Sequence, residues 1–386
     1  MAGGSCGNGG DGGAAIATSA QLNNPYGIAA DDHETIYIAD KNNNKIRKVT
    51  HAGIITTFAG TGSWGSSGDG SAAISGQLNQ PQGVAVDITS GSVYIADTGN
   101  GRIRVVNHNG IISTFAGSYS YSSYNSYDCA ATSAQLVSPG AVAVDHLGNV
   151  YIGTGNQYSS NGNQVLYIAH GTSYITALAG CSSCYTNGYS GSAINVRLYP
   201  VTGIAVDVNL NVYIATSTQY QSNNQVLIVT HSTGIIAIFA GSNNWSPTNG
   251  DGGPASSAQL RSPSGIGVDF NGNVYITDQQ NNNVRLVSNG TGIITTYAGG
   301  GTGGLGDNGP ATNAYLNSPY GIAVNVKGNV IIADTNDYRI RKITNINDNP
   351  TGQPSAQPSI PTSQPSVQPT GDPTAWHVTR EVSIVY

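Results

Sequence analysis

The sequence is poor in charge, and the charges it has are scattered. Only 9% of the 386 residues are charged, with 14 Lys+Arg against 20 Asp+Glu and a formal net charge of −6. Nucleic acid is not expected as a partner, because phosphate binding needs clustered cations and no basic run occurs. Glutamate is found only at Glu34 and Glu381, which leaves no glutamate pair for acid–base catalysis.

Long apolar segments and a targeting signal are also missing. No apolar run approaches the roughly 20 residues that a membrane-spanning helix needs. Residues 1–20 are rich in Gly and Ala and show no apolar core of a signal peptide. We therefore expect no membrane span, and no signal peptide is visible in this chain.

Four cysteines are too few for a disulfide scaffold. Cys6 and Cys129 stand alone, while Cys181 and Cys184 form a C-S-S-C step. Without a βαβ context, this step favours a small loop disulfide, or unpaired thiols, over redox catalysis. Two sequons begin at Asn244 and Asn289 and would accept glycan in an exported chain.

Glycine and tyrosine are abundant instead. The chain has 52 Gly, and 22 Tyr against 4 Phe. High glycine with many Ser, Thr and Asn suits an all-β protein with many turns. Tyrosine combines a packing ring with a hydroxyl that stays in water, which favours half-exposed binding surfaces.

One phrase recurs six times and indicates a repeat architecture. It reads N-N-P-Y-G-I-A-A-D in the first copy and N-S-P-Y-G-I-A-V-N in the last. Successive copies end 56, 58, 62, 62 and 56 residues apart. The copies end at Asp31, Asp87, Asp145, Asp207, Asp269 and Asn325.

Each unit contains short Val- and Ile-rich runs separated by turn residues, which is typical of strands. Asn271-Gly272 and Lys327-Gly328 lie between the first two runs, where tight hairpins form. A β-solenoid would have shorter coils and parallel strands. We predict an all-β, six-bladed β-propeller of four-stranded antiparallel blades. The first strands are expected near 27–31, 83–87, 141–145, 203–207, 265–269 and 321–325.

The phrase P-x-G-[IV]-A-V-D, followed by V-Y-I-A-D-[T]-x-N-x-R-I-R and G-I-I-[ST]-T-F-A-G, resembles the NHL repeat family over about residues 10–344. That resemblance implies a family of protein- and RNA-binding propellers, extracellular adhesion modules and a zinc-dependent amidating lyase. Six-bladed relatives include metal-dependent lactonases. The first strands, which would line the axis, carry no His or Glu, so we expect a non-enzymatic member.

The sixth unit lacks its fourth strand, so the predicted blade is either incomplete or closed by another segment. Residues 1–4 align with the end of that strand, and the tail, with Val382, Ile384 and Tyr386 on one alternating face, is a second candidate. A stalk leading to a further domain is the alternative. We divide the chain into a propeller (1–346), a Pro/Ser/Gln-rich linker (347–374) and a C-terminal tail (375–386).

Units one, two, five and six share an Asp that ends the second strand and an Arg in the third. Units three and four have neither residue. Thr154 and Thr216 replace the Asp, and Leu166 and Leu227 replace the Arg. Joint loss indicates that the two groups interact across the hairpin, and four equal copies favour a structural role over a catalytic one. The predicted pairs are Asp40 with Arg47, Asp97 with Arg104, Asp278 with Arg285, and Asp334 with Arg341.

Four histidines and one acidic run are candidate metal ligands. His51, His108, His170 and His231 all fall in the turn between the third and fourth strands of their units. Such outer turns do not converge on the axis, so they favour loop histidines over a zinc site. The run 269–273 resembles a calcium loop but coincides with a hairpin turn and lacks the downstream Glu. We predict no metal and no cofactor.

Loops of about 20 residues precede the first strands and share a face with the turns between strands two and three. We call this the loop face. Units three and four have longer turns there, and such asymmetry favours a ligand site, although Ser/Tyr loops also tolerate drift. Four loops carry a G-D-G-like core, which we interpret as structural. The predicted contact residues are Trp64, Tyr121, Tyr124, Tyr158, Tyr185, Tyr189, Tyr220 and Trp245.

The leading hypothesis is a non-catalytic propeller that binds a protein or a glycan through the loop face. We expect it to be monomeric and extracellular or at the cell surface, since low charge, sequons and a Pro-rich stalk favour export. The alternative is a metal-dependent lyase or hydrolase of the six-bladed propeller type.

Overall fold

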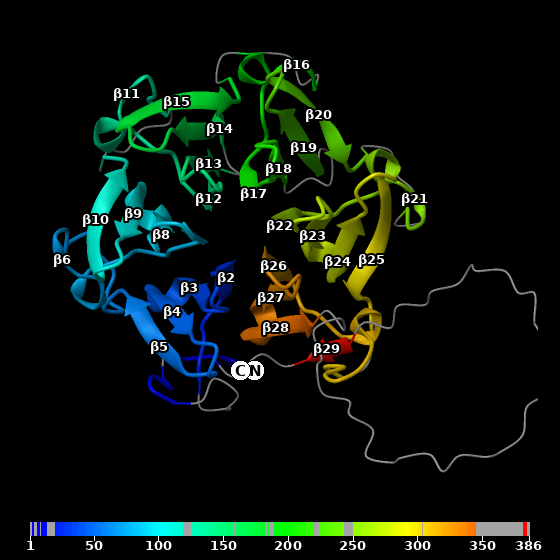
Figure 1. Ribbon diagram of the computed structural model, residues 1–386, viewed down its shortest axis with the longest axis horizontal. Coiled ribbons are helices and arrows are strands. Elements are labelled where there is room, and N and C mark those ends of the chain that lie inside the picture. Colours follow the sequence, from blue (N-terminus) through cyan, green and yellow to red (C-terminus); the bar gives the residue numbers. More distant parts are fainter. Residues whose placement is uncertain are drawn as a thin grey trace, which may run out of the picture.

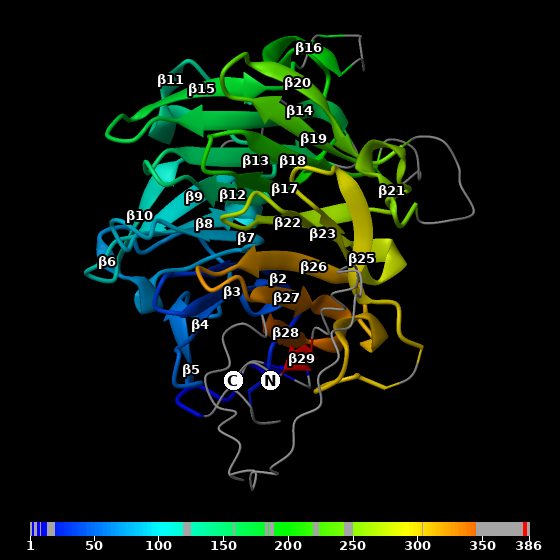
Figure 2. The same cartoon turned by 45° about the vertical axis from the view of Figure 1, so that its right-hand side comes forward.

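The computed structural model of the chain describes residues 2–3, 6–7, 9–13, 20–118, 125–156, 159–181, 184, 189–218, 224–242, 250–302, 304–344 and 381–383. Six antiparallel sheets stand around one central axis as the blades of a propeller (Figures 1 and 2). The prediction of an all-β, six-bladed propeller is therefore confirmed. Within the described ranges no α-helix occurs, and so none that is long and apolar enough to cross a bilayer.

Each blade is a meander that runs outward from the axis, and its strands follow one another in chain order. The inner strands are β2 (Pro25–Ala30), β7 (Gly83–Val86), β12 (Ala141–Val144), β17 (Val201–Val206), β22 (Pro263–Val268) and β26 (Pro319–Val324). The second strands are β3 (Ile36–Asp40), β8 (Val93–Asp97), β13 (Val150–Asn156), β18 (Val212–Thr216), β23 (Val274–Asp278) and β27 (Val330–Asp334). The third strands are β4 (Lys45–Val49), β9 (Arg102–Val106), β14 (Ser159–Ile168), β19 (Gln225–Thr230), β24 (Asn283–Val287) and β28 (Arg339–Thr344).

The outer strands complete five of the blades. They are β5 (Ile55–Ala59), β10 (Ile111–Ala116), β15 (Tyr174–Ala179), β20 (Ile235–Ala240) and β25 (Ile293–Gly299). Four very short strands pair with the outer edge of the last four of these, namely β6 (Ser71–Ala72), β11 (Cys129–Ala130), β16 (Ser190–Ser192) and β21 (Gly253–Pro254). Short 3-10 turns connect the elements at η1 (Lys41–Asn43), η2 (Ala73–Ser75), η3 (Thr98–Asn100), η4 (Ala131–Ser133), η5 (Ala193–Asn195), η6 (Ala255–Ser257), η7 (Gln279–Asn281), η8 (Ala311–Asn313) and η9 (Thr335–Asp337).

The hydrophobic core lies between neighbouring blades. Ile46 of blade one packs in one cluster with Ile95 and Ile112 of blade two. Ile38 of blade one packs in another with Ile340 of blade six, so the same kind of seam also closes the ring. Because each sheet is sandwiched between two others, β8 is buried at every position and shows the continuous apolar run of a strand that is covered on both faces.

Glycine in the inner strands lets adjacent blades meet at the axis. A Cβ on Gly27 would lie 2.4 Å from the backbone oxygen of Gln82, and one on Gly321 would lie 2.1 Å from that of Tyr26. The Gly27 N–H donates a hydrogen bond to the same Gln82 oxygen at 2.8 Å. The recurring Gly of the repeat is therefore explained by close approach of neighbouring backbones.

Blade six has three strands of its own, and two short segments lie along the outer edge of β28. Strand β1 (Ala2–Gly3) pairs Ala2 with Ile340, the register in which Ala59 pairs with Ile46 in blade one. Strand β29 (Glu381–Ser383) pairs Val382 with Ile343. The two segments thus occupy the two halves of the missing outer strand (Figure 1).

The seam between blades six and one carries an additional ion network. The carboxylate of Glu34, in the first turn of blade one, contacts the ammonium groups of Lys327 and, at 3.6 Å, Lys342 of blade six. His51 Nδ1 lies 3.6 Å from the same carboxylate. Among the described residues, every ion pair that joins two different blades belongs to this seam, where the blades are not consecutive in the chain.

We predict that Gly321→Ala destabilises the fold by about 1–3 kcal/mol, because the new methyl group would overlap backbone that cannot move without opening the ring. Gly191→Ala is the matched control, since that glycine has open space around it, and its effect should stay within about 0.5 kcal/mol. Guanidinium unfolding of both variants measures the difference. Equal losses would contradict this explanation of the repeat glycine.

Candidate functional site

The recurring Asp/Arg pairs are in contact, and each arginine also binds a second aspartate. In blade one the buried Arg47 reaches Asp40 through Nη1 at 3.4 Å and Asp11 of the preceding loop through Nη2 at 2.5 Å. The same triad forms around Arg104, Arg285 and Arg341, whose Nη1 atoms lie 3.6, 3.8 and 3.2 Å from the strand aspartates. Their loop partners are Asp69, Asp251 and Asp307.

The loop aspartates belong to the G-D-G-like cores that the sequence analysis described as structural. Their contact with the arginines was missed, because it joins residues 34 to 36 positions apart. A signal was present in the sequence: the cores occur in the same four units as the Asp/Arg pairs. The strand aspartate, the arginine and the loop aspartate occur together in these four units, as expected for three residues that contact one another.

Each triad contains one deeply buried strand carboxylate, and its loop carboxylate is half-exposed in three triads but only 14% exposed at Asp307. Asp97 is fully buried, and its oxygens accept hydrogen bonds from the Asn79 backbone N–H and the Asn100 side chain, both at 2.7 Å. Burial raises the pKa of Asp97 to about 6. Burial also acts to raise the pKa of Asp69, but hydrogen bonds from Thr114 and Arg104 and the arginine's charge lower it overall.

Blades three and four replace the charged triad with neutral residues. Thr154 takes the place of the strand acid, Leu166 that of the arginine, and Tyr127 that of the loop acid, two positions before Cys129. In blade three Asn125 donates hydrogen bonds to Thr154 and Gln164 at 2.8 and 2.9 Å. A buried polar network without ions therefore supports the same blade geometry, which indicates that the triads are structural.

We predict that Arg104→Leu alone costs about 3–5 kcal/mol, because it leaves Asp97 buried without its counter-charge. Adding Asp97→Thr and Asp69→Tyr, the residue types that blade four has at Thr216 and Tyr189, should recover roughly half of that loss. Chemical unfolding of the single and triple variants tests this. A triple variant with strictly additive losses would show that the three groups do not interact.

The buried aspartates predict a pH dependence with a defined sign. A carboxyl whose pKa is raised to about 6 binds protons more tightly in the folded chain, so its contribution to stability declines as pH rises from about 4 to 6. The cost of Asp97→Asn should therefore shrink over this range, while the cost of Asp69→Asn should stay constant between pH 5 and 7. Unfolding free energies at pH 4.5, 5.5 and 7 measure both, and parallel curves would contradict the assignment.

An aspartate, or Asn325 in blade six, follows each inner strand and closes the turn to the second strand. Asp145 accepts hydrogen bonds from the backbone N–H groups of Leu147 and Asn149, both at 2.9 Å, and so closes the tight turn to β13. Asn325 makes the equivalent bonds in blade six. Asp269 does so in blade five, so 269–273 forms the predicted hairpin turn.

The central channel is lined mainly by glycine and aliphatic residues, together with Gln82, Thr202 and Tyr320. Its narrow part is formed by inner-strand residues such as Gly83, Val142 and Ile204. The residues that line this part include no His, Cys, Asp or Glu. One trio of candidate metal ligands, Asp31, Asp32 and His33, is found among the described residues, and it lies in a surface turn where Asp31 accepts the His33 N–H.

The loop face holds the described part of the predicted contact set. Trp64 is 76% exposed on the loop between β5 and β7. Tyr189 is half-buried: its ring packs on the core between blades three and four and its hydroxyl is buried. The residues of the set that lie outside the described part of the chain are Tyr121, Tyr124, Tyr158, Tyr185, Tyr220 and Trp245.

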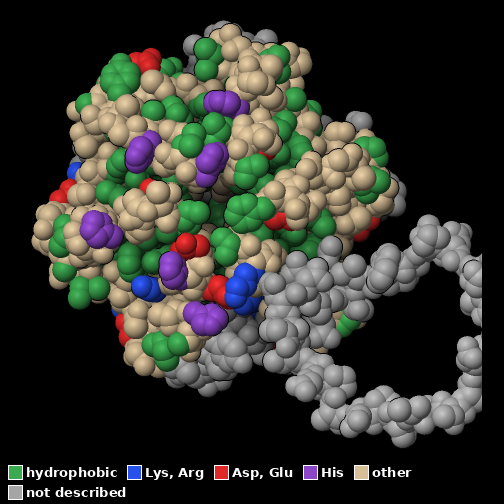
Figure 3. Space-filling model, in the orientation of Figure 1, with side chains coloured by type: hydrophobic (Ala, Val, Ile, Leu, Met, Phe, Trp, Pro, Cys, Tyr) green, Lys and Arg blue, Asp and Glu red, His purple; other side chains and the backbone are tan. Residues whose placement is uncertain are grey.

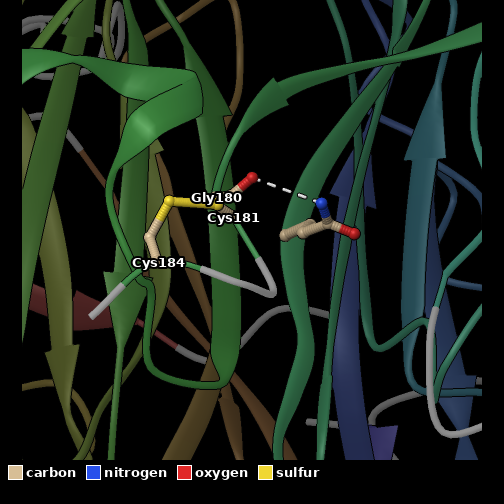
Figure 4. The surroundings of a disulfide bond; sticks show 4 residues. Gly180, Cys181 and Cys184 are labelled. Atoms are coloured by element: carbon tan, nitrogen blue, oxygen red, sulfur yellow. Dashed lines mark hydrogen bonds between the residues drawn. A yellow bond between two sulfur atoms is a disulfide. The ribbon is translucent and has the colours of Figure 1, made fainter. Parts of the chain in front are cut away.

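Cys181 and Cys184 form a disulfide at the start of the loop that follows β15 (Figure 4). Gly180, next to it, accepts a hydrogen bond from Gln164 at 3.2 Å, which ties the loop to the third strand. Cys6 and Cys129 are free thiols. Asn289 is exposed in the turn before β25, and Asn244 lies outside the described residues.

The architecture and these contacts define a six-bladed β-propeller whose recurring aspartates and arginines contact one another. Sequence patterns of known families agree with it. The Teneurin NHL domain matches residues 3–67 and 62–132, a beta-propeller repeat matches 250–277, and the NHL repeat matches 316–343. The chain is an NHL-repeat β-propeller.

Curated relatives are similar over most of this chain but are much longer. Mouse Teneurin-4 is 27% identical over 303 residues, covering 70% of this chain and 10% of its own length. Protein SUPPRESSOR OF QUENCHING 1, chloroplastic, of Arabidopsis thaliana is 28% identical over 275 residues, covering 69% of this chain and 25% of its own. The chain thus spans between a tenth and a quarter of these relatives.

Solved structures with the same fold include a protein of unknown function and an enzyme. A Bacteroides thetaiotaomicron protein of unknown function superposes with a TM-score of 0.60 at 21% identity, over 86% of this chain and 72% of that one. A gluconolactonase from Xanthomonas campestris superposes with a TM-score of 0.53 at 12% identity, over 81% and 83%. At these identities the likeness concerns the fold alone.

Proposed function

We propose that the chain is a non-catalytic binding propeller that recognises a protein or a glycan through its loop face. The proposal depends on the contrast between the recurring charged residues, which bind one another within the blades, and the exposed aromatic residue of the loop face. The recurring acids and arginines bind one another in triads such as that of Arg104. Trp64, in contrast, is 76% exposed on the surface of the propeller. Exposed tryptophan is among the residues that most often dominate binding energy at interfaces.

A catalytic role for the axis has little chemical support. Enzymatic propellers exist among the structural neighbours, and a metal-dependent lyase or hydrolase is the competing function. The narrow channel here is lined by no His, Cys, Asp, Glu or Lys among the described residues, and Tyr320 is the member of that lining whose side-chain type can transfer a proton. Purified protein that holds one tightly bound transition metal per chain would favour the enzyme.

Several features favour display outside the cell. The Cys181–Cys184 disulfide is of a kind that persists in oxidising compartments. Asn289 begins a sequon and is exposed in a turn, where glycan can be added without disturbing the core. We propose an extracellular or cell-surface location and a monomeric propeller.

We predict that screening protein and glycan arrays with the purified chain yields ligands whose affinity falls at least tenfold in the Trp64→Ala variant, in line with the loss of an interface anchor. The triple variant Trp64→Ala/Trp245→Ala/Tyr185→Ala should lose more. Ile235→Ala is the matched control, because Ile235 is also exposed but begins β20 on the opposite face. Ligands that the triple variant retains at full affinity would contradict recognition by the loop face.

A further inference from the structure

The face opposite the loop face, which we call the turn face, is hollowed at the axis. It carries the turns between strands one and two and between strands three and four, and Figure 3 shows histidine side chains spread over it. Where the inner strands end, a hollow of about 180 Å³ opens among residues of blades one to six. That is below the roughly 300–1,000 Å³ of sites for drug-sized ligands, and it suits a single long side chain.

The rim of this hollow is apolar and exposed. In five blades the residue after the turn-closing Asp or Asn lines it, namely Ile88, His146, Val208, Phe270 and Val326. Phe270 is 65% exposed, and Ile88, Val208 and Val326 are 40 to 53% exposed. Such repeated exposure of large apolar side chains around one opening is unusual for a surface that stays in water, and it is typical of an interaction site.

Three carboxylates, those of Asp145, Asp207 and Asp269, line the hollow, and no lysine or arginine does. Their hydrogen-bond donors are neutral. Asp145 accepts from two backbone N–H groups, from Asn149 at 2.8 Å and from the Tyr151 hydroxyl at 2.9 Å. Asp207 and Asp269 have the same kinds of donor. Unlike the triad aspartates, these three acids form no salt bridge with a lysine or arginine of the described residues.

Two lysines of blade six contact a different carboxylate, that of Glu34. Lys327 follows the rim residue Val326 in sequence, but its ammonium group contacts Glu34, which lines a separate pocket beside the hollow. Lys342 lies 3.6 Å from the same carboxylate. The axial hollow thus combines apolar walls with a negative potential, and such a combination attracts a cation carried on an apolar stem.

We propose that the axial hollow of the turn face is a docking site for an arginine side chain presented by a loop of a partner protein. The aliphatic stem of this arginine would lie against Val208 and Val326, and its guanidinium plane would stack on the exposed ring of Phe270. The three carboxylates would attract its positive charge. Arginine is favoured over lysine because its planar, weakly hydrated cation stacks on aromatic rings. This site is independent of the loop face and of Trp64.

The test uses blocked amino acids as probes: N-acetyl-arginine amide, and N-acetyl-citrulline amide as its neutral isostere. NMR titration of the purified chain at low salt should give saturable shifts of the His146 imidazole and of the Val326 amide with the arginine probe. The citrulline probe should leave these signals unmoved, and added salt should weaken binding of arginine. Equal binding of both probes, or no saturable shift with arginine, would overturn the proposal.

Blade six shows which substitution can remove the charge of these aspartates without disturbing their turns. Asparagine closes the same turn in blade six, at Asn325, so Asp145→Asn/Asp207→Asn/Asp269→Asn removes charge with the turn preserved. We expect this variant to bind the arginine probe at least about tenfold more weakly. Asp87→Asn is the matched control, because Asp87 closes the equivalent turn but does not line the hollow. An unchanged affinity in the triple variant, or an equal loss in Asp87→Asn, would overturn the proposal.

A second pair of variants keeps the test decisive if the triple variant unfolds. Phe270→Ala removes the stacking surface at a side chain that is 65% exposed, so the fold should tolerate it. We expect it to weaken binding of the arginine probe about threefold or more. Leu147→Ala, at a similarly exposed turn residue that does not line the hollow, should leave binding unchanged. Equal behaviour of these two variants would contradict the assigned site.

Discussion

Each sheet of the ring is covered on both faces by its neighbours, and this packing of blade on blade determines the rest of the structure. Ile46 and Ile95 meet across one seam, and Ile38 and Ile340 across the one that closes the ring. A blade alone would expose two apolar faces, so the sheets are stable only as a closed set. At the axis the same constraint forces inner strands together, and Gly27 and Gly321 are found where backbones meet.

The charged triads and the neutral network of blade three are two ways of placing polar groups inside this packed ring. Arg104 is fully buried between two aspartates, and blade three reaches the same geometry with Asn125, Thr154 and Gln164. Burying an ion pair costs desolvation that its attraction roughly offsets, so a neutral network is an equivalent solution. For that reason the triads can vary between blades without a change in the fold.

The closing seam is where the chain departs most from its own repeat. Blade six has no outer strand of its own, and β1 and β29 lie at the edge that such a strand would cover. Glu34 adds ion pairs with Lys327 and Lys342 at this seam, in contrast to the intra-blade pairs elsewhere in the described structure. Strand β1, at the outer edge of blade six, precedes β2 of blade one in the chain, so the N-terminal segment joins the two sides of this seam and the Glu34 ion pairs add to that link.

The sequence by itself determined the fold, since a phrase repeated six times with hairpin turns leaves few architectures in which apolar strands can be buried. It also determined that Asp97 and Arg104 interact, because units three and four lose both types together. Tertiary structure alone decided that Asp69 joins them, that Tyr189 packs inward, and that Ile88, Val208 and Phe270 ring one opening. The physical reason is distance along the chain: local pattern governs strands and turns, whereas convergence of residues from several blades exists only after the ring has closed.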